Sequence, residues 1–338
     1  MNKLYLTAVL TVLVSCAQPI TKGQEQNLHN NHTVFGVNKL HPHADFFAYE
    51  SVELANKKDL ESSSRFLSLD GKWKFHWVKS PKDRIRNFYV KNLNDEEWKT
   101  IPVPANWEVE GYDHPIYLDE RYPFNSQWPD APTEYNPVGT YRHTFNISKE
   151  WLDDDIILHF AGAKSAMYLY INGQYVGYSQ GSKTPAEFNI DEFVIDGENL
   201  IAIQMYRWSD ASYLESQDML RMSGIEREVY VYAKPKVAVT DFHVIADLDS
   251  TYQDGIFSNT IEIVNASEQN STRILKVQVL NDGNEVIGFE KLLEVNANDT
   301  SKIKFEELIK NVKHWSAETP NCYTLNIQLI DEKEEKNN

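Results

Sequence analysis

The stretch that decides the fold is residues 165–181, SAMYLYINGQYVGYSQG. Its dipeptide Asn172-Gly173 lies between two runs whose side chains alternate in character. Asn and Gly both tolerate a positive φ, which the two central residues of a type I′ turn require. Two alternating runs around such a dipeptide predict a β-hairpin.

Other segments carry the same two-residue period. The segments LDGKWKFHWV (69–78), NLIAIQMYRW (199–208) and REVYVYAK (227–234) each place apolar side chains on one face. Those side chains are Trp73, Phe75 and Trp77 in the first segment, Ile201, Ile203 and Met205 in the second, and Val229 and Val231 in the third. This period predicts strands. Since strands nowhere alternate regularly with amphipathic helices, the chain is predicted to be all-β, without a parallel α/β barrel of its own.

A change of composition marks a domain boundary. The sequence Lys234-Pro235-Lys236 separates an aromatic-rich part from a second part with few aromatics and short alternating runs divided by Asn, Asp and Gly. A unit of about 100 residues with this pattern is typical of an immunoglobulin-like β-sandwich. We therefore expect one domain with an amino-terminal arm over residues 34–232, a second domain over 233–331, and a polar tail over 332–338.

The amino terminus has the pattern of a targeting segment. In MNKLYLTAVLTVLVSC, a short basic start is followed by an apolar run that ends at Leu13-Val14-Ser15-Cys16. This ending resembles a bacterial lipobox, which implies cleavage before Cys16 and acylation of that residue. We expect residues 1–16 to be a lipoprotein-type signal peptide, residues 17–33 a polar tether, and the protein to be lipid-anchored in the bacterial cell envelope. The alternative is an ordinary signal peptide with a chance cysteine.

Composition excludes some partners. The 33 Lys+Arg against 50 Asp+Glu leave a formal net charge of −17, which repels phosphate backbones and anionic lipids. We therefore expect no nucleic-acid partner, and membrane contact only through the lipid. The sequence has two cysteines, Cys16 and Cys322. Because Cys16 would be acylated, only Cys322 would keep a free thiol, and no internal disulfide is expected.

One long segment has the composition of a carbohydrate site. Residues 106–145 are crowded with Pro, Tyr, Trp and carboxylates but have little periodicity. Aromatic rings cover the apolar faces of sugars, and Asp, Asn and Gln bind their hydroxyls. The alternative is a set of long loops packed on their own aromatic side chains. The composition leaves both interpretations open.

A second segment, RWSDASYLESQDMLRMSGIERE (207–228), fits neither a helix nor a strand and is predicted to be a loop. Together with SLDGKWKFHW, IPVPANWEVEGYDHPIY, PTEYNPVGTYRHTF, INGQYVGYSQGSKTPAEFNI and HWSAETPNCYTL, in this order, it resembles the amino-terminal region of the large β-galactosidases of glycoside hydrolase family 2. The resemblance covers about residues 34–330. It implies a jelly-roll, galactose-binding-like domain followed by an immunoglobulin-like domain.

The resemblance also implies site residues. In the family, the Asp of the Trp-Ser-Asp run contacts the galactosyl hydroxyls and helps to ligate a monovalent cation such as Na⁺, so Asp210 would inherit both roles. A ligand-contacting Asn precedes the family's Pro-Thr-Glu motif. Counting back from Pro132 without a gap gives Gln127, whereas a shifted loop would give Asn125. In the rest of the loop, Asp218 and Arg221 are expected to pair or to bind loop backbone, and Gly224 to turn the chain into the next strand.

The family's catalytic pair is not among these segments. Both catalytic Glu residues, and a Mg²⁺ site, belong to a (β/α)₈ barrel that this sequence does not encode. We therefore expect the amino-terminal portion of an enzyme that hydrolyses terminal non-reducing β-D-galactosides, inactive alone. The alternative is a free-standing, non-catalytic carbohydrate-binding or assembly lipoprotein.

Several partners remain possible under either hypothesis. They are a galactoside, a second copy that contacts the arm at about Phe35–Ser64, and a barrel-bearing chain. The pair His41 and His43 is interpreted as incidental rather than metal-binding, because no matching ligand spacing accompanies it.

Overall fold

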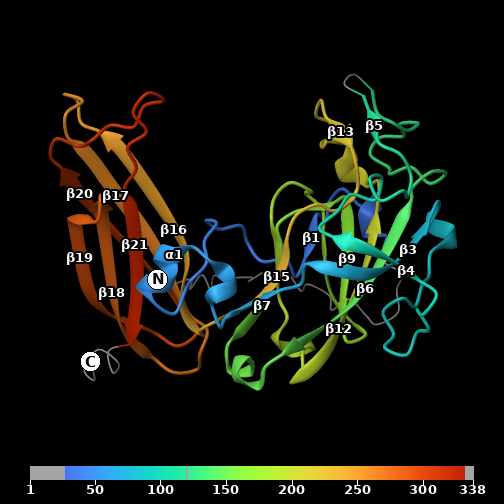
Figure 1. Cartoon of the computed structure of the whole chain (residues 1–338), viewed down its shortest axis with the longest axis horizontal. Helices are drawn as coiled ribbons and strands as arrows, with labels where there is room; N and C mark the ends of the chain where they lie inside the picture. Colours follow the sequence, from blue (N-terminus) through green and yellow to red (C-terminus); the bar gives the residue numbers. More distant parts are fainter. Residues whose placement is uncertain (1–26, 119–120, 332–338) are drawn as a thin grey trace, which may run out of the picture.

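The computed structural model describes residues 27–118 and 121–331. Its chain forms two β-sandwich domains side by side, with an amino-terminal arm running between them (Figure 1). The strands pair antiparallel in every sheet of the described residues. The predicted all-β fold is confirmed.

Two facing sheets build the amino-terminal domain. The larger sheet has the order β1 (Gly36–Val37), β10 (Gln174–Ser179), β9 (Ala166–Ile171), β12 (Gly197–Tyr206), β6 (Val138–Ile147), β3 (Gly71–Val78), β4 (Lys99–Val103). The smaller sheet has the order β11 (Ala186–Asn189), β7 (Asp155–Phe160), β15 (Val229–Lys234), β2 (Phe66–Ser68). Two short pairs, β5 (Ile116–Tyr117) with β13 (Leu220–Arg221) and β8 (Ala163–Lys164) with β14 (Gly224–Ile225), extend from this sandwich. This is the jelly-roll architecture that the resemblance implies.

The predicted hairpin joins β9 to β10. Asn172 has φ 51° and Gly173 has φ 84°, so both central residues are left-handed, as a type I′ turn requires. On its other edge β9 pairs with β12 along its whole length, from Ala166 opposite Tyr206 to Ile171 opposite Ile201. The hairpin therefore lies within the larger sheet.

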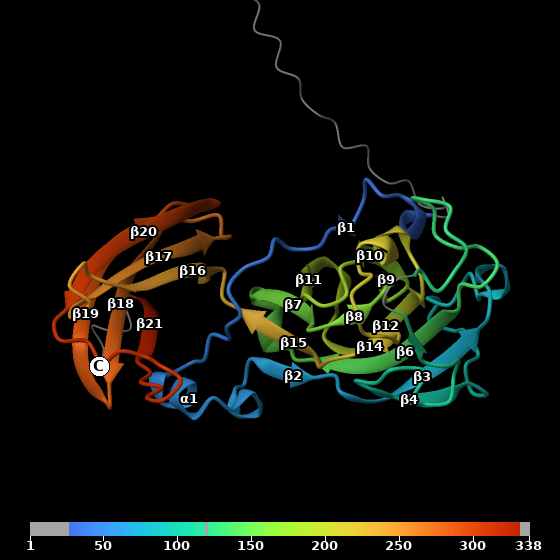
Figure 2. The same cartoon turned by 90° about the horizontal axis from the view of Figure 1, so that it is seen from above.

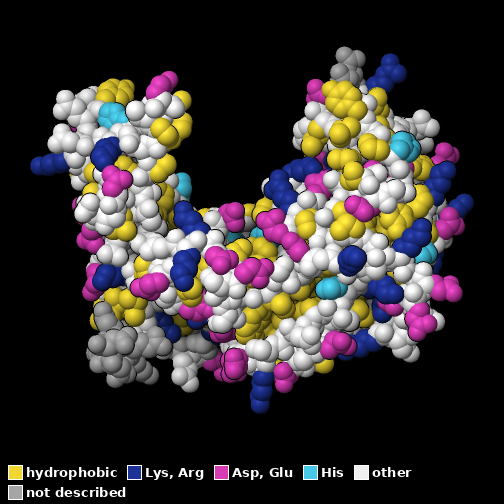
Figure 3. Space-filling view, viewed as in Figure 1, with side chains coloured by type: hydrophobic (Ala, Val, Ile, Leu, Met, Phe, Trp, Pro, Cys, Tyr) yellow, Lys and Arg dark blue, Asp and Glu magenta, His cyan; other side chains and the backbone are white. Residues whose placement is uncertain are grey.

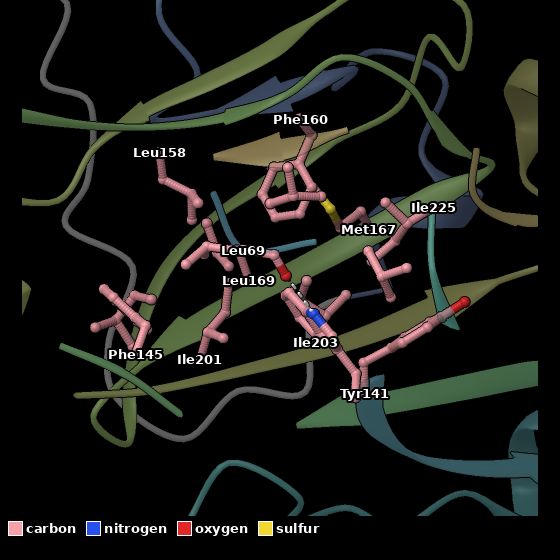
Figure 4. Close-up of a cluster of buried hydrophobic side chains, with 14 of the residues drawn as sticks. Leu69, Tyr141, Phe145, Leu158, Phe160, Met167, Leu169, Ile201, Ile203 and Ile225 are labelled. Carbon is pink, nitrogen blue, oxygen red and sulfur yellow. Dashed lines mark hydrogen bonds between the residues drawn. The ribbon is translucent and has the colours of Figure 1, made fainter. Parts of the chain in front are cut away.

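The core of this domain lies between the two sheets. Trp73 and Phe75 of β3 are buried and Trp77 is half-buried, which confirms the predicted face. Figure 4 shows part of the cluster, to which β7 of the smaller sheet and β9, β12 and β6 of the larger sheet contribute. Burying each large apolar side chain is worth about 1.5–3 kcal/mol, so this interdigitated layer holds the sandwich together.

The carboxyl-terminal domain is a smaller sandwich. One sheet has the order β16 (Val237–Leu248), β17 (Gly255–Asn265), β20 (Asp299–Ile309), and the other has the order β19 (Asn284–Val295), β18 (Ser271–Asn281), β21 (Thr324–Asp331). Alternate residues of the central strands of the two sheets, such as Ile261 and Ile263 on β17 and Leu275 and Val277 on β18, are fully buried. The predicted immunoglobulin-like fold is confirmed, and Lys234 and Val237 bound the short link between the domains.

Helical structure is brief. It consists of α1 (Val52–Lys57) and the 3₁₀ turns η1 (Leu28–Asn30), η2 (Leu60–Ser62), η3 (Pro81–Asp83), η4 (Lys149–Asp153), η5 (Asp191–Phe193) and η6 (Asp210–Tyr213). Helix α1 is capped at its start by Ser51, whose hydroxyl accepts a hydrogen bond from Leu54 N, and at its end by left-handed Lys58. Within residues 27–118 and 121–331, no helix is long and apolar enough to span a bilayer.

The arm connects the two domains. Leu40 N donates to the carbonyl of Glu187 on β11, and Ala44 N donates to Asp241 Oδ1 on β16, each at 2.9 Å. The ring of Phe46 lies 5.3 Å from that of Phe242, also on β16. Figure 2 shows the same segment passing between the sandwiches before α1. The arm therefore contacts both domains through backbone, carboxylate and aromatic groups.

Part of the expected tether is packed on the larger sheet. The imidazole of His29 stacks on Tyr206 with the ring centroids 3.9 Å apart, and its Nδ1 lies 3.0 Å from Tyr168 Oη. Burial lowers the pKa of His29 to about 4. Residues 27–33 therefore differ from the predicted tether. The polar composition of this segment gives no sign of this contact, because the tyrosines on which His29 packs belong to the larger sheet.

Candidate functional site

The site lies where β12 ends and η6 begins. Ser209 and Ser212 form a capping box, in which each side chain bonds the backbone N–H of the other residue. Ser209 Oγ also lies 2.7 Å from Ser165 Oγ, at the start of β9. The first turn after the strand is thus fixed by side chains rather than by a long helix. The predicted loop over 207–228 is confirmed, since it contains only η6 and the two-residue strands β13 and β14 in this described part.

Asp210 is held rigidly with one oxygen unused. The residue is 7% exposed. Its Oδ1 accepts a hydrogen bond of 2.8 Å from Gln180 Nε2, and Gln180 Oε1 accepts one of 2.6 Å from Tyr178. Its Oδ2 is buried and has no hydrogen-bond partner among the described residues. Burial raises the pKa of Asp210, although hydrogen bonds from the Gln180 side chain and from the backbone of Ala211 and Asn31 oppose this. A buried carboxylate oxygen without a partner is costly unless water, a cation or a ligand reaches it.

Tyr213 joins the two segments that the sequence singles out. Its hydroxyl accepts a hydrogen bond of 3.1 Å from the backbone N–H of Gln127 and donates one of 2.9 Å to the carbonyl of Asp130. Tyr122, Phe124 and Trp128 of the same loop pack around its ring. Because Tyr213 is the last residue of η6, this loop is attached to the turn that carries Asp210.

The structure distinguishes the two alternative contacts by their attachment. Gln127 and Asn125 are both exposed on the loop, but it is the backbone N–H of Gln127 that donates to Tyr213. The side chain of Gln127 offers a donor and an acceptor next to this anchor. Asn125 lies two residues before this anchor in the chain.

The buried side chain of Arg207 joins the segment around Asp113 to the loop over 207–228. The Arg207 side chain is fully buried, donates to Asp113, and lies 3.6 Å from Glu108. It also donates to the carbonyls of His114 and Arg221 at 3.1 and 3.0 Å. Asp113 therefore pairs directly with this guanidinium and Glu108 lies beside it, which makes both residues structural. Sequence reasoning did not find this network.

The remaining loop predictions are met in part. Arg221 is buried and binds loop backbone, donating to the carbonyl of Glu215 at 2.7 Å. Asp218 is exposed and instead accepts a hydrogen bond of 2.5 Å from Tyr117, so the alternative of a direct Asp218–Arg221 pair is wrong. Gly224 has φ +126°, and a Cβ there would overlap the carbonyl oxygen of Ala105. Glycine is required where the chain turns into β14.

Some aromatic side chains of the segment 106–145 are buried and others are exposed. Trp107 and Tyr141 are buried in the core, whereas Trp128 is 67% and Tyr117 58% exposed. The alternative of loops packed on their own aromatics therefore holds for part of the segment 106–145. Trp128 is the residue that sequence reasoning missed, although its position directly after Gln127 is a usable signal.

Asp210 offers one oxygen to a hard cation. A carboxylate oxygen without a hydrogen-bond partner is a ligand of the kind that such ions prefer. Across residues 27–118 and 121–331, no three His, Cys, Asp or Glu side chains cluster so that they could hold a metal ion. His43, one of the two histidines interpreted as incidental, contacts a carboxylate of the sheet, with its Nε2 2.7 Å from Glu187 Oε2. Cys16 lies outside the described residues.

A jelly-roll domain followed by an immunoglobulin-like domain, with a loop site of carboxylate, amide and aromatic groups, is the arrangement of the β domains of a modular glycosidase. Residues 66–235 match the model described as the sugar-binding domain of glycosyl hydrolases family 2, and residues 237–338 match the model described as glycosyl hydrolases family 2. The chain belongs to glycoside hydrolase family 2. It comprises the family's amino-terminal sugar-binding and immunoglobulin-like domains, and the described residues contain no barrel.

Sequence relatives include β-galactosidases. The chain is 41% identical over 307 residues to a β-galactosidase of Priestia megaterium, which covers 89% of this chain and 30% of that protein. It is 36% identical over 303 residues to one of Halalkalibacterium halodurans, covering 88% and 29% respectively. The chain therefore spans about 30% of the length of these relatives.

Solved structures share the fold. A β-glucuronidase of Bacteroides uniformis superposes with a TM-score of 0.67 at 22% identity, over 80% of this chain and 31% of that one. A β-glycosidase of Bacteroides vulgatus gives a TM-score of 0.60 at 22% identity, over 80% and 32%. At this identity the likeness supports the two-domain fold.

Proposed function

We propose that this chain supplies the sugar-binding wall of a β-galactosidase that acts on terminal non-reducing β-D-galactosides. The observation that carries the proposal is Asp210, a rigid carboxylate with Oδ2 unpartnered on the turn that Tyr213 joins to Gln127. In this proposal Oδ2 accepts hydrogen bonds from galactosyl hydroxyls, and the Gln127 amide makes the second polar contact. The identity to β-galactosidases supports the substrate class.

Turnover in this proposal needs groups from elsewhere. Retaining glycoside hydrolysis uses two carboxylates about 5–5.5 Å apart across the scissile bond. Glu108 and Asp113 are held against Arg207, so they cannot serve as that pair. We therefore infer that the described domains bind and orient the sugar. A barrel carries the acid/base and the nucleophile, either in the same polypeptide or in a separate chain, and the Mg²⁺ site belongs with that barrel.

Exposed apolar side chains support docking of such a barrel. Hydrophobic side chains gather at the tip of the lobe that carries β5 and β13 (Figure 3), where Tyr117, Leu214 and Leu220 are 58%, 81% and 48% exposed. In the second domain, Trp315 is 66% exposed at a largely apolar cavity of about 500 Å³. Apolar patches of this kind mark interaction surfaces.

Two further features belong to the same proposal. A monovalent cation such as Na⁺ would be held by Asp210 and would supply a fixed positive charge to sugar oxygens. The protein would be anchored in the bacterial cell envelope through an acylated Cys16. The acidic composition supports a site for a neutral sugar over one for a nucleic acid.

The test is hydrolysis of a chromogenic β-galactoside by the full chain alone and after mixing with a β-galactosidase fragment that carries the barrel. We expect no turnover alone and turnover on mixing, and we expect the Asp210→Ala chain to restore little of it. Turnover by the chain alone, or full restoration by Asp210→Ala, would contradict the proposal. Tight galactoside binding by the chain without a barrel would instead favour the free-standing binding protein.

A further inference from the structure

The exposed indole of Trp128 is the feature of this site that the fold does not use. It is 67% exposed, whereas Trp208, whose ring lies 5.3 Å from that of Phe124 in the same loop as Trp128, is 3% exposed. Large aromatic side chains are usually well buried when the chain can bury them. The Trp128 ring nevertheless has a fixed place, because its centroid lies 5.8 Å from that of Tyr213.

The loop beneath Trp128 is braced on both sides of the residue. Gln127 N and the carbonyl of Asp130 both bond Tyr213 Oη. Ala131 N donates a hydrogen bond of 2.7 Å to Asn30 Oδ1 in the amino-terminal segment. An aromatic face on a braced loop loses little conformational freedom when a ligand binds, which favours binding.

The position of Trp128 relative to Asp210 follows from η6. Tyr213, against which Trp128 packs, is three residues after Asp210, and one turn of a 3₁₀-helix rises about 6 Å. The Asp210 carboxylate, the exposed side chain of Gln127 and the exposed indole of Trp128 are therefore all arranged around η6. Sugars present apolar C–H faces to aromatic rings and hydroxyls to carboxylates and amides.

We propose that Trp128 is a stacking platform for the sugar unit linked to the galactosyl group, so that it sets the preference for a disaccharide over a simple alkyl galactoside. This inference rests on the proposed galactosyl contact at Asp210. Stacking needs an apolar ring face rather than a particular set of hydroxyls. The platform therefore accepts different sugars in the linked position and contributes to affinity more than to turnover.

The experiment follows indole N–H signals of the ¹⁵N-labelled full chain during titration with lactose and with methyl β-D-galactoside. Trp128→Phe assigns the Trp128 signal, and Trp315, which is 66% exposed in the other domain, is the matched control. We expect lactose to shift the Trp128 signal more than the methyl galactoside does, while Trp315 stays unchanged.

Variants of Trp128 measure how much stacking contributes to the affinity for lactose. We expect Trp128→Ala to raise the Kd for lactose by about 2- to 12-fold, to leave the Kd for methyl β-D-galactoside unchanged, and to unfold at the wild-type temperature. Trp128→Phe keeps a stacking face and should retain most of the lactose affinity. Trp315→Ala should change neither Kd.

The outcomes separate this inference from the proposed function. If Asp210→Asn abolishes sugar-induced shifts but Trp128 does not respond in the wild type, or if Trp128→Ala weakens both sugars equally, the platform is wrong and the galactosyl contact stands. If no signal responds to either sugar up to its solubility limit, the platform is overturned, while the proposed function is decided separately by the turnover test with the barrel fragment.

Discussion

His43 Nε2 lies 2.7 Å from Glu187 Oε2, and this contact closes a clasp between the arm and the amino-terminal domain. The second carboxylate oxygen of Glu187 lies 2.8 Å from His159 Nδ1 and accepts a hydrogen bond of 3.1 Å from Tyr232. The residue after His43 bonds Asp241 of the other domain. The clasp therefore fixes the part of the arm that bridges the two sandwiches.

The clasp predicts a defined pH dependence of stability. Burial alone would raise the pKa of Glu187, but hydrogen bonds from His159 and His43 outweigh it and lower the pKa to about 2. This stabilisation is present above pH 4.5 and is lost as pH falls toward 2. The hydrogen bond to Glu187 raises the pKa of His43 above 6.5 despite burial, so its stabilisation is complete below pH 6.5 and is lost as pH rises through the raised pKa.

We therefore expect the clasp to contribute most between about pH 4.5 and 6.5, by on the order of 2–3 kcal/mol. The measurement is urea unfolding from pH 3 to 8 for the wild type and Glu187→Gln. Because His29, with its pKa of about 4, loses packing as pH falls and is present in both proteins, the difference curve isolates the clasp. A flat difference curve would show that Glu187 does not act through its charge.

Removing the Asp210 carboxylate should impair galactoside turnover in the assembly that carries the barrel. A hydrogen bond to a charged group is worth about 1.5–3 kcal/mol, so we expect Asp210→Asn to lower kcat/KM by about 10- to 100-fold. Asp218→Asn is the matched control, because Asp218 is an exposed carboxylate of the same loop. Equal activities of the two variants would remove Asp210 from the site.

Tyr213→Phe should loosen the loop that carries Gln127. The change deletes the hydroxyl that bonds both Gln127 N and the carbonyl of Asp130, and we expect a loss of about 1–2 kcal/mol in the free energy of unfolding. Hydrogen exchange at Gln127 should accelerate. Tyr122→Phe, which loses one longer hydrogen bond of 3.3 Å, should have a smaller effect, and a reversed order would argue against this role for Tyr213.

Two glycines test the turn into β14. Gly224 and Gly283 have φ of +126° and +79°, but a Cβ at Gly224 would overlap Ala105, while one at Gly283 meets nothing within 4 Å. We expect Gly283→Ala to cost about 1 kcal/mol and Gly224→Ala at least about 3 kcal/mol. Thermal unfolding of both variants checks the difference, and similar midpoints would mean that the backbone at Gly224 adjusts freely.

Acylation at Cys16 can be tested directly. In a bacterial host, intact-mass measurement of the full-length product should show loss of residues 1–15 and the added mass of acyl chains, and the protein should fractionate with membranes. Cys16→Ser should abolish both properties. Cys322→Ser is the control, because Cys322 is an exposed free cysteine in the carboxyl-terminal domain. Unchanged membrane fractionation of Cys16→Ser would contradict the lipid anchor.

The sequence by itself determined the strands, the type I′ hairpin and the order of the two domains. These features follow from local properties, namely the two-residue period of apolar side chains and the tolerance of Asn172 and Gly173 for positive φ. The family resemblance, which contiguous motifs carry, implied Asp210 and the Gln127 loop as candidates.

Only the tertiary structure decided which distant groups meet. Tyr213 contacts the loop at Gln127, His29 stacks on Tyr206, Arg207 takes Asp113 as its partner, and Trp128 is left exposed. Each outcome depends on residues far apart in the chain, and a polar or aromatic side chain carries no local signal of its distant partner. The physical reason is that periodicity determines which face a side chain takes, whereas sheet packing determines what lies opposite that face.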